Sequence, residues 1–373
     1  MKFQITPEAS LAILKYSMAL TCCWPPSLNA NRSKIFICDI LCFLAFISAM
    51  LLLIPLLNSV YQDRSDTMIL LKSIYLSCAA AHVANKIAIC WIHRYRLQFL
   101  LKEVTDFLHH ANERERNIMQ HYADKYGILH VFFTISNYMG ALGVILGPLF
   151  TSAPFPTDAK YPFAVDFKPV KYVIYAHQSL TGFQVSAAMS IDCLVGYLLW
   201  FVAARFKILS LNFRDAKNEK EFCLCVRQHQ KLLKYANEVR TAVCFLIFTT
   251  MSSATCALIF CGTHIFTPGT MIVKVQSAII VGAGCGLLFV TSLSAEHAIA
   301  MSTNIGYEVY NSSWNTLSSK LLTSRIIVLQ RSRKPVTVQI GGILPRLSLS
   351  YYAQYLSNVF SYLAAVRMLV NIE

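Results

Sequence analysis

Six long stretches of this 373-residue chain contain no Asp, Glu, Lys or Arg. A helix needs roughly 20 predominantly apolar residues to cross a bilayer. The composition, 55% hydrophobic and only 14% charged, also argues against two soluble domains. The stretches therefore predict membrane-spanning helices. They are Ile40–Leu57, Tyr126–Thr157, Tyr172–Ile191, Thr241–Val273, Val275–Ala295 and Leu347–Val366.

A seventh span is predicted over 67–92, which is apolar but contains Lys72 and Lys86. Both lysines lie near its ends, where we expect their long side chains to reach the lipid headgroups. The whole chain, 1–373, then forms a single all-α membrane domain of seven transmembrane helices. The predicted spans are 35–57, 67–92, 126–150, 173–204, 241–264, 273–297 and 347–370.

The placement of Lys and Arg predicts the orientation of the chain, because cytoplasmic loops accumulate these residues. The N-terminal segment and the second, fourth and sixth loops hold 25 of the 33, whereas the opposite side holds six and the second span the other two. We expect a cytoplasmic N-terminus and an extracellular C-terminus. The net charge of +14 is then a topology signal, and no nucleic-acid partner is expected.

Two predicted cytoplasmic segments, 222–239 and 318–334, have apolar residues at mixed spacings of three and four among Lys and Arg. This pattern is typical of amphipathic helices. We therefore expect the helices of spans four, five and six to extend below the membrane. Together with a short anchor helix over 318–334, they would form a cytoplasmic helical anchor layer.

No enzyme motif is found, and no catalytic residue, metal or cofactor is expected. The glycines of Gly282-x-Gly284-x-Gly286 lie inside an apolar span without a preceding strand, so close helix packing is favoured over a nucleotide-binding loop. His109, His110 and Glu113 lie in a segment rich in both charge signs, which favours a solvated face over a metal site.

Asp192 is the one acidic residue well inside a predicted span. An intramembrane carboxylate can be functional. The favoured alternative is structural, with Asp192 hydrogen-bonded to a neighbour such as a Ser or Tyr, or hydrated from the cytoplasm. His82, in the second span, is expected to be an interhelical hydrogen-bond donor.

The last span carries a stripe of polar and small residues. Asn358, Ser361, Ala365 and Met368 step by three, four and three and so share one helix face, with Leu369 beside Met368. Such a stripe suits the wall of a pore whose gate opens by wetting. It equally suits a helix–helix seam, where small and polar residues also collect. The spacing leaves both interpretations open.

Several motifs along the chain together carry a resemblance to the insect odorant receptor family. In the C-terminal region they are Lys334-Pro335, Gly341-Gly342, Pro345, Ser348-Leu349, Ser361-Tyr362 and Arg367. Upstream they are Tyr161-Pro162-Phe163, Tyr175, His177, Gln178, His229-Gln230-Lys231, Tyr235, Tyr310, Trp314 and Leu317. The resemblance covers essentially the whole chain. Leu363 and Met368 depart from it, since the family often has an aromatic residue and a Gln there.

The resemblance implies an odorant-gated, non-selective cation channel of the plasma membrane in sensory neurons. Four subunits, usually this chain with a co-receptor, would surround one pore lined by Asn358, Ser361, Ala365, Met368 and Leu369. The chain lacks the long fourth-loop insertion of the co-receptor and so resembles a tuning subunit. The alternatives are a gustatory-type receptor channel and a membrane receptor that signals through a cytoplasmic partner.

The resemblance also implies an odorant site in the outer half of the bundle, between spans two, three, four and six. The candidate residues are Ser73, Ile74, Ser77, Ser136, Met139, Gly143, Phe183, Ala187, Ile279 and Ala283. None is charged, so we expect a small, mostly apolar volatile that binds by shape and dispersion. The third loop, rich in Pro and aromatic residues, is expected to form a lid over the bundle.

Overall fold

The computed structural model describes residues 4–28, 30–150, 153–266, 271–312, 319–343 and 345–370, and they form helices joined by turns and loops, without a strand. The predicted all-α fold is confirmed. The helices are α1 Pro7–Ser17, α2 Arg32–Gln62, α3 Thr67–Ile92, α4 Arg94–His110, α5 Glu113–Leu146, α6 Lys168–Asp215, α7 Glu219–Phe266, α8 Met271–Asn311, α9 Ser319–Ser332 and α10 Leu349–Val370, with short 3-10 turns at Ala19–Thr21 and Gly147–Leu149.

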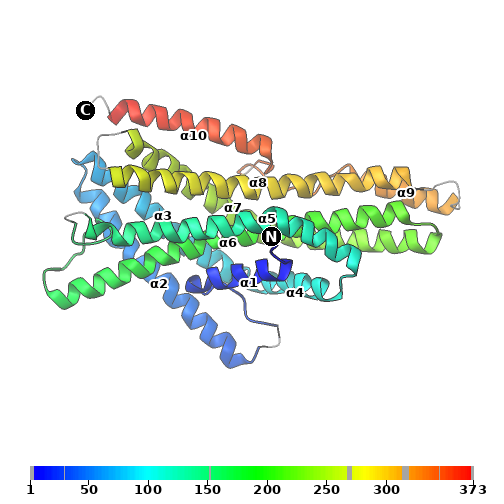
Figure 1. The fold of residues 1–373 in the computed structure, drawn as a ribbon, viewed down its shortest axis with the longest axis horizontal. Coiled ribbons are helices and arrows are strands. Elements are labelled where there is room, and N and C mark those ends of the chain that lie inside the picture. The colour runs from blue at the N-terminus through cyan, green and yellow to red at the C-terminus, as the bar shows by residue number, and fades with distance from the viewer. Residues whose placement is uncertain are drawn as a thin grey trace.

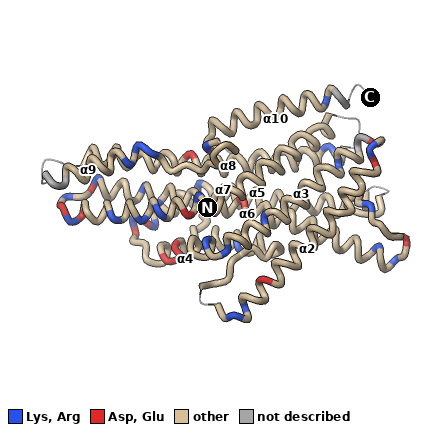
Figure 2. Tube along the Cα trace, turned by 180° about the vertical axis from the view of Figure 1, so that it is seen from behind, with Lys and Arg blue, Asp and Glu red and all other residues tan. Residues whose placement is uncertain are grey.

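The molecule is an elongated bundle in which α5, α6, α7 and α8 run along the long axis (Figure 1). The helix α9 and the turn between α6 and α7 form one end, and α2 and α3 lie toward the other. α10 lies along one side of the bundle. Lys, Arg, Asp and Glu gather around α4, α9 and the α6–α7 turn and at the opposite tip, with few charges between (Figure 2). An uncharged middle is what a bilayer requires.

Within the described residues, six helices are long and apolar enough to cross a membrane. They are Arg32–Gln62, Ile69–Ile92, Glu113–Leu149, Lys168–Asp215, Glu219–Phe266 and Lys274–Asn311. α6 and α7 each contain 48 residues, about 72 Å of helix at 1.5 Å per residue, more than twice the thickness of a hydrocarbon core. Both helices therefore extend well beyond one membrane face, in line with the predicted anchor layer.

α10, Leu349–Val370, corresponds to the predicted seventh span, 347–370, and has the length to cross a bilayer, but its described residues are not among these six. Gln354 and Asn358 lie in its middle and are both exposed in the single chain. Polar side chains at membrane depth are tolerated when they face protein or a water-filled path. Its composition thus suits a helix that is not surrounded by lipid alone.

α9 packs against α8 at the charged end of the bundle. Its buried Arg325 donates hydrogen bonds from Nη2 to the carbonyl oxygens of Val309 and Ser312, both at 3.0 Å. These bonds satisfy the carbonyls at the end of α8. The helix corresponds to the predicted anchor helix 318–334, of which residue 318 lies outside the described residues.

α6 forms the centre of the bundle, and 94% of its most apolar segment is buried. The fully buried Trp200 ring lies parallel to Tyr126 of α5, with ring centroids 6.4 Å apart. Gly286 of α8 faces Phe133 of α5 so closely that a Cβ could not be added without a shift. The predicted close packing is therefore confirmed at Gly286, whereas Gly282 is exposed.

Lys86 does not reach the headgroups as predicted. Its side chain is 0% exposed and forms an ion pair with Asp192 of α6, and its Nζ donates to the carbonyl of Ala188 at 3.2 Å. The expectation was wrong because α6 brings a carboxylate to the same depth, which the spacing within one span cannot reveal. Lys72, in contrast, lies at the surface and pairs with Asp158 at 2.6 Å.

The ion pair is part of a buried polar cluster that joins three helices. Thr250 of α7 donates its hydroxyl to Asp192 Oδ1 at 2.5 Å. His82 of α3 lies with Nδ1 3.3 Å from the Thr249 carbonyl, which confirms the expected interhelical contact. α3, α6 and α7 are therefore held together by hydrogen bonds at a depth where water cannot replace them.

We predict that Lys86→Met alone and Asp192→Asn alone each destabilise the protein by about 3–5 kcal/mol, because each leaves one buried charge without its partner. The double variant should recover most of the loss. The measurement is the melting temperature of the detergent-solubilised protein, together with surface delivery. Lys72→Met is the matched control and should cost less than about 1 kcal/mol. Single variants as stable as the wild type would contradict the prediction.

Candidate functional site

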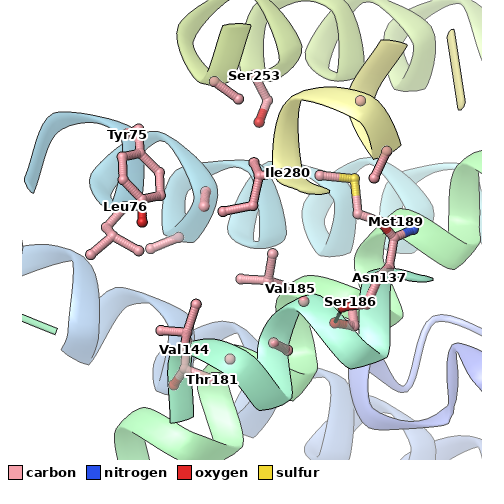
Figure 3. A pocket seen from close by; sticks show the side chains of 18 of the residues that line it. Tyr75, Leu76, Asn137, Val144, Thr181, Val185, Ser186, Met189, Ser253 and Ile280 are labelled. Carbon is pink, nitrogen blue, oxygen red and sulfur yellow. Dashed lines mark hydrogen bonds between the residues drawn. The ribbon is translucent and has the colours of Figure 1, made fainter. Parts of the chain in front are cut away.

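A cavity of about 150 Å³ lies between α3, α5, α6, α7 and α8 (Figure 3). An apolar cavity of about this volume in another protein stays dry and binds benzene, so the space suits a small organic molecule. Tyr75 and Leu76 of α3 lie at one end in this view, and Asn137 and Met189 lie at the other.

The wall of the cavity is apolar for most of its area, with a few polar side chains. Val144, Val185 and Ile280 contribute hydrocarbon, and the side chain of Val185 lies near the centre of the view. Among the described residues that line the cavity, none is Asp, Glu, Lys or Arg. A neutral ligand is therefore favoured, since an unpaired buried charge is too costly to desolvate.

The loop between α5 and α6 closes one side of the cavity through Pro156 and Thr157. The Thr157 backbone N–H donates to Gln178 Oε1 at 3.0 Å, and Gln178 Nε2 donates to the Tyr161 hydroxyl at 3.2 Å. Burial raises the pKa of Tyr161, against the opposing effect of this bond, so the phenol stays neutral. The described part of the third loop thus packs over the bundle, as the lid prediction expected.

The buried ion pair lies directly behind the cavity wall. Thr250 lines the cavity and donates to Asp192, which pairs with Lys86. Asp192 itself does not line the cavity. The pair therefore fixes the rotamer of a wall residue without presenting a charge to the ligand.

Three of the ten predicted ligand-binding residues line this cavity, namely Ser136, Ile279 and Ala283. The other seven do not, and for α5 the physical reason is helix rotation. Met139 is 58% exposed and Gly143 is exposed too, because both lie on the outer face of the helix. The three-and-four spacing of Ser136, Met139 and Gly143 predicts a shared side of the helix but not which residues of that side point inward.

The remaining predicted residues make contacts elsewhere. The Ser73 hydroxyl bonds that of Ser59 on α2 at 3.0 Å, and Ser77 donates to the Ser73 carbonyl at 2.7 Å. Phe183 stacks on Tyr138, with ring centroids 6.3 Å apart. Ile74, which is half-buried, and Ala187, which is fully buried, also lie outside the cavity wall.

Sequence analysis missed several residues of the wall, among them Asn137, Met189, Thr250 and Ser253. A signal existed for Asn137, an amide in the middle of a charge-free span beside the predicted Ser136. A partner for Asp192 was also available in Lys86, a cation within the second span, but their distance in the sequence hid this pairing.

Four of the five predicted pore residues lie on the outward face of α10. Asn358, Ser361 and Ala365 are exposed, and Met368 is 64% exposed. Leu369 lies within helix α10, but its side chain lies outside the described part of the structure. The stripe is therefore not a packing seam within this chain.

The seam of α10 is formed instead by its buried Tyr355, Val359 and Leu363. A Cβ on Gly262 of α7 would lie only 2.9 Å from Leu363 Cδ1, and the hydroxyls of Thr255 and Tyr355 are 2.9 Å apart. Leu363, which is buried, and Met368, which is exposed, therefore lie on different faces of α10.

Comparison with known proteins finds odorant receptors of insects. Odorant receptor Or2 of Anopheles gambiae is 22% identical over 156 residues, which are 39% of this chain and 39% of that protein. Odorant receptor 67c of Drosophila melanogaster is 23% identical over 168 residues, 45% of this chain and 41% of that protein. The matched regions thus span about two fifths of the length of these relatives.

The fold is similar to that of the insect olfactory receptor OR5 from Machilis hrabei, solved in complex with eugenol. The TM-score is 0.84 at 15% identity, over 97% of this chain and 99% of that one. The structure of the same receptor described without eugenol gives a TM-score of 0.82 at 14% identity, over 95% and 97%. The family described as "7tm Odorant receptor" matches residues 67–360, well over half of the sequence. The chain therefore belongs to the seven-transmembrane odorant receptor family.

Proposed function

We propose that this protein is the ligand-binding subunit of an odorant-gated cation channel, oriented with its N-terminus in the cytoplasm of a sensory neuron. The observation that carries the proposal is the uncharged, mostly apolar cavity in a chain of the odorant receptor family. The eugenol complex of OR5 from Machilis hrabei, which has a similar fold, supports a small volatile as the ligand. We assign the ligand to the wall described above, which keeps Ser136, Ile279 and Ala283 of the predicted set.

α7 offers a route from the cavity to α10. Ser253, Ala254 and Ala257 of α7 line the cavity, and Thr255, on another side of the same turns, contacts Tyr355 of α10. A ligand that binds more tightly to one position of α7 shifts the population toward it. Because Gly262 and Leu363 are packed without spare space, α10 would follow this movement.

The exposed stripe of α10 is our proposed pore lining. Four such helices, contributed by this chain and a co-receptor, would place Asn358, Ser361, Ala365, Met368 and Leu369 around one axis. A ring of apolar side chains can close a pore by excluding water. The cytoplasmic layer of α4, α9 and the ends of α6 and α7 would hold the subunits together, while the outer faces of the other helices contact lipid.

The proposal predicts that cells expressing this chain with a co-receptor respond to volatiles with a cation current. The current should persist in excised membrane patches, because no cytosolic factor is needed. The measurement is patch-clamp recording with a panel of neutral volatiles, with the co-receptor alone as control. A current that disappears on excision would favour the alternative of signalling through a cytoplasmic partner, and silence to the whole panel would contradict the proposal.

We predict that Val185→Phe fills the cavity and raises the half-maximal odorant concentration by about tenfold or more. Overpacking by this much costs roughly 1–3 kcal/mol, and 1.4 kcal/mol is tenfold in affinity. Val173→Phe is the matched control on the exposed face of α6. Met139→Ala, outside the cavity, should leave the concentration–response curve unchanged. Equal effects of the two phenylalanines would contradict this site.

We predict that Met368→Asp raises the resting cation current, because a charge at a dry constriction would keep it hydrated. Leu363→Asp on the buried face of α10 should instead reduce surface delivery, since its side chain packs against α7. The measurements are resting current, reversal potential and surface labelling. Wild-type conduction from Met368→Asp channels at normal surface density would exclude Met368 from the pore.

A further inference from the structure

One side-chain amide on the cavity wall has no partner. Asn137 lines the cavity from α5, and its Nδ2 is buried without a hydrogen bond. Its backbone carbonyl accepts a bond from Ser186 at 2.8 Å, which fixes the position of the residue against α6. Buried polar groups are nearly always paired, and an exception calls for an explanation. A ligand in the cavity would supply the missing acceptor.

Three hydroxyls of the wall are already engaged in hydrogen bonds within the chain. Thr181 donates to the His177 carbonyl at 3.0 Å, Ser186 to Asn137, and Thr250 to Asp192. Each hydroxyl has only one hydrogen to donate. Of the described residues that line the cavity, only Asn137 and Thr157 have a buried side-chain N or O atom without a partner. The amide of Asn137, which has two hydrogens, is therefore a buried donor without a partner at the wall of the cavity.

The position of Asn137 also indicates the shape of that ligand. The residue lies at the end of the cavity opposite Tyr75, and Val185 and Ile280 lie between them (Figure 3). A ligand that fits would carry its polar atom at one end and hydrocarbon along the rest. The volume of about 150 Å³ limits it to a molecule somewhat larger than benzene at most, unless the walls move.

We propose that the ligand is a small neutral volatile with one terminal hydrogen-bond acceptor, of the aldehyde or ketone class, held by the Asn137 amide. The inference rests on the proposed function and adds the chemical class of the ligand. A hydrocarbon of equal size would fill the cavity but leave the amide unpaired. Acids and amines are disfavoured because the wall offers no counter-ion: Lys86 is already paired with Asp192 behind it.

The test uses two pairs of volatiles that differ only in replacing C=O by C=CH₂: benzaldehyde with styrene, and 2-heptanone with 2-methyl-1-heptene. The chain is expressed with a co-receptor. The half-maximal concentration of each volatile is given as the concentration of that volatile dissolved in the bath. We expect the carbonyl member of at least one pair to act at about tenfold lower concentration, equivalent to about 1.4 kcal/mol. Asn137→Leu, which keeps the size but removes the amide, should bring the ratio close to one.

Asn117→Leu is the matched control, because Asn117 lies exposed on the same helix and away from the cavity. It should keep the wild-type ratio. A wild-type ratio near one, or an unchanged ratio in Asn137→Leu channels at normal surface density, would overturn the inference while leaving the proposed function intact. Silence to every volatile would overturn both. If Asn137→Leu is not delivered to the membrane, the ratio of half-maximal concentrations in wild-type channels decides the test by itself.

Discussion

The arrangement of the helices depends on how the chain pairs two charges at the depth of the membrane. Lys86 and Asp192 lie on different helices, and neither could be placed there alone without a large desolvation penalty. Their pairing fixes α3 against α6, and the Thr250 hydroxyl adds α7 to the same cluster. Because Thr250 is also part of the cavity wall, the contact that holds the bundle together shapes the space available to a ligand.

One helix, α7, contacts both the cavity and the helix of the proposed pore, each with a different side. α7 presents Ser253 and Ala257 to the cavity, and Thr255 and Gly262 to α10. One rigid helix that contacts both regions is a simpler path than a chain of separate side chains. The tight contact at Gly262 leaves no slack between α7 and Leu363, so a displacement of one helix requires a displacement of the other.

Sequence alone predicted the helical membrane fold, because the absence of charge over 20 residues leaves a chain few alternatives in lipid. It could not predict the rotation of α5, by which Ser136 lies in the cavity wall whereas Met139 lies on the outer face. Nor could it pair Lys86 with Asp192, since 106 residues separate them and only the packing of α3 on α6 brings them together. On α10, the different faces of Leu363 and Met368 followed from the helical period alone.

The contrast between α6 and α10 bears on assembly. α6 pairs several of its buried polar groups within the chain, through the ion pair and through bonds such as Ser186 to Asn137. α10 instead turns Asn358, Ser361 and Gln354 outward, and its described residues are not among the six clear spans. A helix with an exposed amide face is poorly solvated by lipid. The face that a single chain leaves unsatisfied on α10 is thus the face that neighbouring subunits and a water-filled path would complete.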